Sequence, residues 1–76
     1  MPAAFVVITA ELGSEDEVLD ELKKLEGVKE AYCVYGVYDI IAKVEADSME
    51  KLRDTVTWKV RKVNKVRNTL TMLVTK

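Results

Sequence analysis

The sequence predicts one α+β domain in which strands and helices follow the order βαββαβ. Two segments carry apolar residues at helical spacing, and four others are apolar and rich in β-branched residues in the manner of strands. Glycines or short polar stretches separate most of these segments. A chain of 76 residues can build one modest core, so we expect a single domain over residues 1–76.

The first part of the chain is expected to form a strand and then a helix. Ala3 to Ala10 is a short, apolar, β-branched run that is typical of a buried strand. Ser14 to Glu17 has the form of a capping box, in which a hydroxyl and a carboxylate bind free amides at a helix start. The helix should therefore begin there and end near Glu26, with Gly27 as its C-terminal cap. Its buried face should hold Val18, Leu22 and Leu25.

A hairpin is expected to follow. The segments 28–35 and 38–46 are strand-like, and Gly36-Val37 between them is a tight connection that favours antiparallel pairing.

Asp47 and Ser48 are candidate caps for a second helix, with Glu50 placed to answer Asp47. Apolar residues then keep to one helical face for about four turns. The residues of this face are Met49, Leu52, Val56, Val60 and Val63. Val66 to Lys76 alternates β-branched and apolar residues and is predicted to be the last strand.

This element order is that of a split βαβ unit, in which right-handed crossovers place four antiparallel strands in one sheet with both helices on one face. The predicted fold is therefore a ferredoxin-like sandwich. The uncovered face should be polar, yet Phe5 and Val7 alternate with Val6 and Ile8, and the last strand carries Leu70, Met72 and Val74 on one side. Either the helices cover more of the sheet than assumed, or a partner, most simply a second copy, covers the apolar face.

Composition excludes several classes of function. The net charge of -1 gives no field that would draw the chain to nucleic acid or anionic membranes, so neither is expected as a direct partner. The chain has no histidine and no nucleophile or phosphate-loop motif, which indicates a protein that is not an enzyme and uses no cofactor or metal. The single cysteine, Cys33, is interpreted as a small unreactive core residue, and a cytoplasmic location is expected.

The turn formed by Gly36, Val37, Tyr38 and Asp39 is the most compact polar constellation in the sequence. A glycine lets backbone groups approach a ligand, and the Asp39 carboxylate could bind a ligand ammonium. An ordinary hairpin turn, with the carboxylate bonded to local backbone, explains the same residues. Two hydroxyls on one side of the last strand could grip a polar ligand or simply suit a strand. They belong to Thr69 and Thr71.

Trp58 should be exposed in a monomer, because it lies about 200° from the centre of the apolar face of its helix. An exposed tryptophan is either a contact residue or a surface aromatic without a role, and both interpretations stay open.

Gly36 to Val44 (GVYDIIAKV), a helix after it, and Val66 with Thr69-Leu70-Thr71 resemble the effector-binding RAM domain of the Lrp/AsnC transcriptional regulators. The resemblance extends over nearly all of the chain. It implies a ferredoxin-like fold, dimers formed sheet against sheet, rings of four dimers, and amino acids bound where dimers meet. Carried over by position, Gly36, Tyr38 and Asp39 belong to the effector turn.

The family's N-terminal helix-turn-helix has no counterpart in the sequence, so a stand-alone module is expected, acting through a full-length relative. The leading hypothesis is an oligomeric module that senses amino acids or related metabolites in transcriptional or metabolic regulation. An ACT-like regulatory domain, a structural adaptor for full-length relatives and a small ferredoxin-like enzyme are the alternatives.

Overall fold

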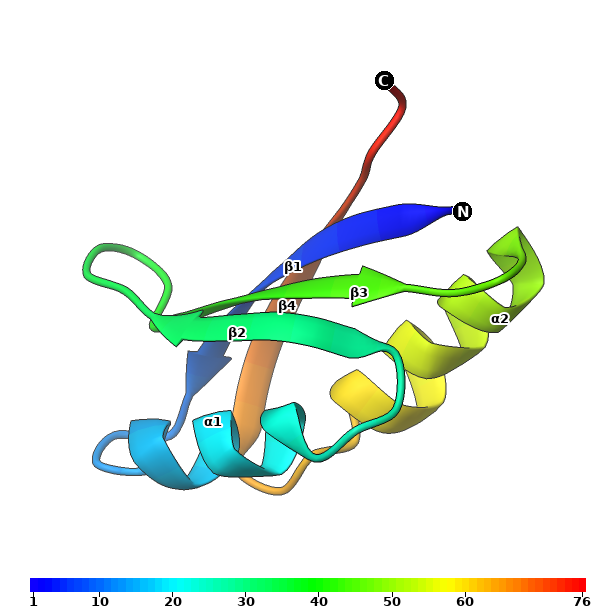
Figure 1. Cartoon of the computed structure of the whole chain (residues 1–76). Coiled ribbons are helices and arrows are strands. Elements are labelled where there is room, and N and C mark those ends of the chain that lie inside the picture. The colour runs from blue at the N-terminus through cyan, green and yellow to red at the C-terminus, as the bar shows by residue number, and fades with distance from the viewer.

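The computed structural model describes residues 1–76 and contains one antiparallel sheet in the order β2-β3-β1-β4, with the helices on one face (Figure 1). The strands are β1 (Ala3–Ala10), β2 (Val28–Cys33), β3 (Ile40–Glu45) and β4 (Val66–Leu73). The helices are α1 (Glu15–Lys23) and α2 (Met49–Asp54), and α2 continues into the π-helical segment η1 (Thr55–Val60). The predicted ferredoxin-like βαββαβ fold is confirmed.

The core lies between the sheet and the helices. Even-numbered residues of β1 and β3 point toward the helices and are buried, because side chains alternate between the two faces of a strand. From the helical side, the predicted apolar stripes fill the same space, except for Met49, which is 41% exposed. The core residues are Ala4, Val6, Ile8, Ala10, Val18, Leu22, Ala31, Ile40, Ala42, Val44, Leu52, Val56 and Val60.

The predicted hairpin is present, but its connection is not tight. β2 ends at Cys33 and β3 begins at Ile40, so residues 34–39 form a loop rather than a two-residue turn. The loop is closed by the amide of Val34, which donates to the carbonyl of Asp39 at 2.8 Å. Gly36 has φ +136°, which breaks the strand on either side. β4 likewise ends at Leu73 and not at Lys76.

The first helix begins where predicted, but its capping bond and its C-terminal end differ from the prediction. Ser14 precedes it, but its hydroxyl caps no amide, because the residue has φ −110° and ψ 11° instead of an extended conformation. Glu15 Oε2 accepts from the amide of Gly13 at 3.4 Å instead. The helix ends at Lys23, so Gly27 is not its cap. Gly27 has φ +97°, and a Cβ there would lie 3.3 Å from both the Glu45 carbonyl oxygen and Thr55 Cγ2.

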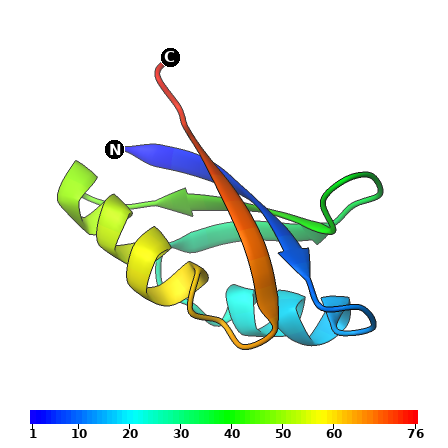
Figure 2. The same ribbon diagram turned by 180° about the vertical axis from the view of Figure 1, so that it is seen from behind.

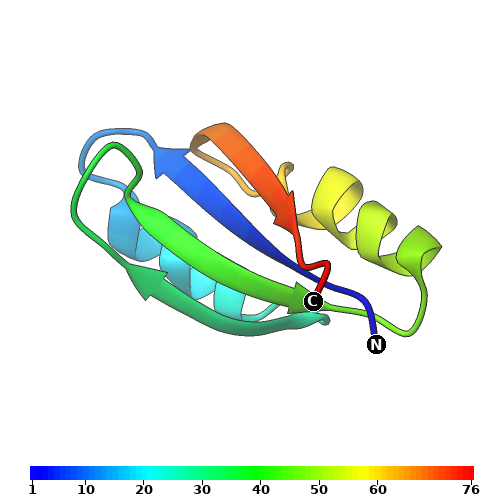
Figure 3. The same ribbon diagram turned by 90° about the horizontal axis from the view of Figure 1, so that it is seen from above.

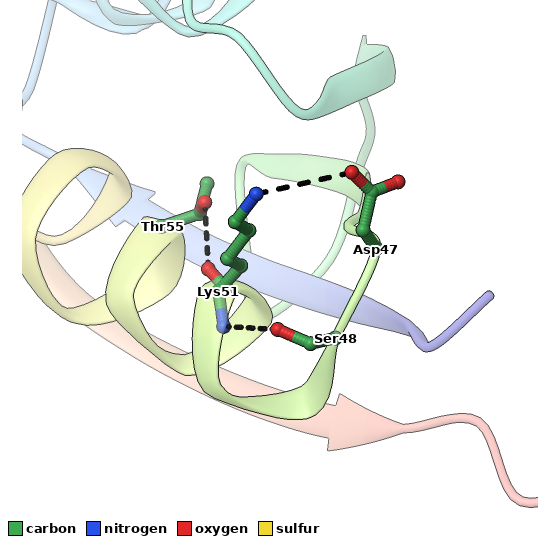
Figure 4. Close-up of polar contacts among 4 residues, drawn as sticks. All are labelled: Asp47, Ser48, Lys51 and Thr55. Atoms are coloured by element: carbon green, nitrogen blue, oxygen red, sulfur yellow. Dashed lines mark hydrogen bonds and ion pairs between the residues drawn. The ribbon is translucent and has the colours of Figure 1, made fainter.

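The second helix starts as predicted, with Ser48 as its N-cap. Ser48 Oγ accepts from the amide of Lys51 at 3.2 Å, and the ammonium of Lys51 lies 3.9 Å from Asp47 (Figure 4). The helix widens at Thr55, whose hydroxyl donates to the Lys51 carbonyl at 2.9 Å. Such bonds to the preceding turn bend helices.

The wider turn changes the end of this helix. The amide of Arg61 donates to the carbonyl five residues earlier, at Val56, over 3.0 Å, as in a π-helix. Val63 therefore lies beyond the helix, although the sequence pattern had placed it on the helical face. Its side chain still packs against the core.

No helix covers the other face of the sheet (Figure 3). Phe5 lies opposite Met72, and Val7 lies opposite both Leu70 and Ile41. Val7 and Ile41 are half-buried, whereas Phe5, Leu70 and Met72 are exposed in the single chain. The expected apolar uncovered face is therefore present. None of the helices has the length and apolar character that crossing a membrane requires.

Candidate functional site

The β2–β3 loop projects from one end of the sheet and carries the predicted effector turn (Figure 1). Its apolar residues point to solvent, since Tyr35 is 106% exposed and Val37 is 87% exposed. Tyr38 is half-buried at the base of the loop. A loop tip with bulky apolar side chains in water is a surface that association or ligand binding would cover.

Asp39 ties this loop to the neighbouring strand β1. Its amide donates to the carbonyl of Ile8 at 2.9 Å, and its Oδ2 accepts from the amide of Ala10 at 3.0 Å. The register between β1 and β4 shifts at Ala10, so the carboxylate binds an amide at an irregular point of the ladder. The carboxylate therefore has a structural role. The hairpin-turn interpretation predicted a bond to backbone, but the bonded amide belongs to β1 and not to the turn itself. Its Oδ1 accepts no hydrogen bond from the chain.

Gly36 is the residue of the loop that requires glycine. Its φ of +136° is a conformation that side chains rarely adopt, although a Cβ there would meet no atom within 4 Å. The space beside Gly36 is thus open, and a ligand could approach the backbone there.

The two threonines lie apart from this turn within one chain. Thr69 pairs with Ile8 and Thr71 with Val6, so both hydroxyls are on the helix side of β4. β1 lies between β4 and the turn, a separation of two strand spacings, roughly 10 Å. One chain does not bring the hydroxyls and the Asp39 carboxylate together. A site using both would need a neighbouring subunit.

The β1–α1 turn lies at the same end of the sheet as the β2–β3 loop (Figures 1 and 3). Leu12 in this turn is 96% exposed. Sequence reasoning missed Leu12, because a single leucine outside a periodic run carries no signal of its own. Leu12 thus adds a further exposed apolar side chain at this end of the molecule.

Cys33 is exposed at the end of β2, so its interpretation as a core residue is wrong. The strand places it at the edge of the sheet, where no further strand covers it. Partial desolvation raises the pKa of its thiol, and the carboxylates of Asp16 and Glu15 raise that pKa further. A raised pKa means that less of this thiol is ionised at neutral pH than in an unperturbed cysteine.

Trp58 is 66% exposed on η1, as expected from the helical wheel. The ammonium of Lys62 lies 5.9 Å from the centre of its ring, within range of a cation–π contact. Near it, Lys65 forms a 3.1 Å ion pair with Glu17 of α1.

The strand order, with both helical segments on one face of the sheet, defines the chain as a small α+β domain of ferredoxin-like architecture. The family model described as the Lrp/AsnC ligand binding domain matches residues 3–76. The chain belongs to this family of transcriptional-regulator domains.

Two relatives are uncharacterised HTH-type transcriptional regulators. The protein from Pyrococcus furiosus is 36% identical over 73 residues, which cover 92% of this chain and 49% of the relative. The protein from Pyrococcus horikoshii is 32% identical over the same shares of the two chains. This chain thus spans about half the length of these relatives.

Solved structures agree with the assignment. A hypothetical protein from Pyrococcus horikoshii superimposes with a TM-score of 0.92 at 41% identity, covering 100% of this chain and 92% of that one. AsnC of E. coli superimposes at 0.90 and 26% identity, covering 99% of this chain and 51% of AsnC. A transcriptional regulator from Neisseria meningitidis in complex with L-Met shares the fold, with a TM-score of 0.83 at 16% identity over 99% of this chain and 50% of that one.

Proposed function

We propose that the chain is an oligomeric effector-binding module that senses an amino acid or a related metabolite and thereby regulates transcription or amino-acid metabolism. The observation that carries the proposal is the exposed Gly36–Asp39 turn, which holds a carboxylate at the rim of an apolar surface.

The turn offers part of what a zwitterion needs. Asp39 Oδ1 is free to accept from a ligand ammonium while Oδ2 keeps its bond to Ala10. Backbone amides around Gly36 can donate to the ligand carboxylate, because the space beside this residue is open. The wall that would exclude water is missing in a single chain, and Tyr35, Val37 and Leu12 are placed to meet a neighbour that supplies it.

Oligomerisation is the second part of the proposal. The apolar face of the sheet would pack against the same face of a second copy, since identical patches related by a two-fold axis match one another. Dimers joined in this way would meet at the loop end of the sheet, with a ring of four dimers as the form that the family suggests. Thr69 and Thr71 of one subunit could then face the turn of another.

A full-length relative with a helix-turn-helix is the proposed route to DNA. The curated relatives are transcriptional regulators about twice as long as this chain, and the shared domain would let mixed assemblies form. The module itself would act in the cytoplasm, without catalysis and without direct contact to nucleic acid.

A thermal screen of the common amino acids tests the proposal. A ligand at 100 times its Kd stabilises the folded assembly by about 2.7 kcal/mol. For so small a domain this raises Tm by roughly 10 °C or more. Asp39→Asn should abolish the shift, because the amide cannot pair with an ammonium but can still accept from Ala10. No shift with any amino acid, or an unchanged response of D39N, would refute the assignment of this site.

A further inference from the structure

A groove lies between the helical segment α2–η1 and the edge strand β4. Figure 2 shows these two elements next to one another. The volume of the groove is about 670 Å³, within the range of small-molecule sites. The groove is open because the side chains of Leu52 and Val56 point into the core and do not cover the facing residues of β4. Leu73, which lies on the helix side of β4, is still 53% exposed.

The charges that line the groove are all positive. Arg53 and Arg61 belong to its helical wall, and no aspartate or glutamate lines it. Neither arginine forms an ion pair within the chain, whereas Lys24, Lys43, Lys51 and Lys65 each do. The strand wall adds the hydroxyls of Thr69 and Thr71. The groove therefore combines two uncompensated cations with hydroxyls and aliphatic walls.

We infer that this groove binds a small carboxylate with a short aliphatic chain and no amino group, such as a branched 2-oxo acid. Guanidinium groups bind carboxylates through paired, charge-assisted hydrogen bonds. The aliphatic chain would cover Met49 and Leu73, which line the groove and are 41% and 53% exposed, and so would remove apolar surface from water. The threonine hydroxyls can donate to the oxo oxygen.

The absence of acidic residues makes the groove selective. The ammonium of an amino acid would find two positive charges and no carboxylate, so it would lose hydration without an ion pair in return. The Gly36–Asp39 turn has the opposite character, since it presents a carboxylate. The two sites would then distinguish an amino acid from the 2-oxo acid of the same carbon skeleton. The inference goes beyond the proposed function and does not depend on it. Thr69 and Thr71 would serve both sites where a neighbouring turn reaches them, whereas Arg53 and Arg61 line the groove alone.

The test uses 4-methyl-2-oxopentanoate and L-leucine as probes, titrated into the full chain and followed by NMR. We expect chemical-shift changes at Leu52, Val56 and Leu73. The oxo acid should bind there at least about tenfold more tightly than leucine, because the unpaired ammonium of leucine would lower its affinity by that factor. R53Q/R61Q should weaken oxo-acid binding by about tenfold or more. K23Q/K24Q on α1 makes the same change of charge outside the groove and should bind like the unmodified chain.

Several results would overturn the inference. If the groove bound leucine as tightly as the oxo acid, the proposed selectivity would be wrong. If R53Q/R61Q bound the oxo acid as tightly as the unmodified chain, the arginines would not be the groups that bind its carboxylate. If K23Q/K24Q lost as much oxo-acid affinity as R53Q/R61Q, the loss would reflect the net charge of the chain and not a site in the groove. Shifts confined to residues 36–39 would move the oxo acid to the other site. D39N distinguishes the two proposals, because it should abolish the amino-acid response and leave oxo-acid binding unchanged.

Discussion

Asp39 illustrates how one side chain can serve both fold and function. Its Oδ2 holds the amide of Ala10 where the β1–β4 register shifts, and its Oδ1 is left for a ligand. Local patterns predicted a carboxylate in a turn, but the partner amide lies 29 residues away in the sequence.

Asp39→Ala should therefore lower the free energy of unfolding by roughly 1.5–3 kcal/mol, the cost of losing a hydrogen bond to a charged acceptor. Asp39→Asn should lose less than half of that, since its amide oxygen can replace Oδ2. Urea denaturation of the ligand-free protein measures both. Equal losses in the two variants would mean that the bond to Ala10 contributes little.

Gly27 and Gly13 are both in the left-handed region, with φ of +97° and +83°. Gly27→Ala should cost clearly more than Gly13→Ala, because its new Cβ would crowd Glu45 and Thr55, whereas at Gly13 nothing lies within 4 Å. We expect about 1 kcal/mol at Gly13 from backbone strain alone and roughly 2–4 kcal/mol at Gly27. Chemical denaturation of the two variants provides the comparison, and equal costs would contradict the importance of the close approach.

At the scale of elements, the two helix starts make a matched pair. Both are preceded by a serine, but only Ser48 is extended and accepts a hydrogen bond, from Lys51. Ser14 has the fuller sequence signature, with Glu17 three residues after it, and yet makes no cap bond.

Ser48→Ala should thus destabilise the fold by about 1 kcal/mol, the usual cost of a lost N-cap. Ser14→Ala should change stability by less than about 0.5 kcal/mol, as expected for a substitution that removes no specific interaction. Thermal unfolding distinguishes the two variants. A Ser14→Ala loss as large as that of Ser48→Ala would show that the first helix is capped in solution after all.

At the scale of the whole molecule, the uncovered sheet face governs association. Leu70 is exposed on that face, on the edge strand β4 and opposite Val7. Burying a charge there without a partner would cost several kcal/mol in each subunit.

Leu70→Asp should consequently yield monomers at low micromolar concentration, while Leu70→Met keeps the apolar surface and should remain oligomeric. Light scattering gives the mass of each variant. If the unmodified chain is itself a monomer at that concentration, or if Leu70→Asp retains the oligomer, the sheet face is not the contact.

The sequence alone determined the element order, the bounds of β1, the start of the second helix and the apolar stripes that fill the core. These features depend on neighbours within a few residues, because strand alternation, helical spacing and serine caps are local effects. The exposed Trp58 was predicted for the same reason.

Only the tertiary structure decided which residues meet across the sheet. The bond from Ala10 to Asp39, the exposure of Cys33 at the edge of β2 and the separation of Thr69 and Thr71 from the turn all depend on strand order. The groove with its two unpaired arginines depends on where α2 and η1 pack relative to β4. Such contacts join residues far apart in the chain, and no local pattern encodes a distance between segments that only packing brings together.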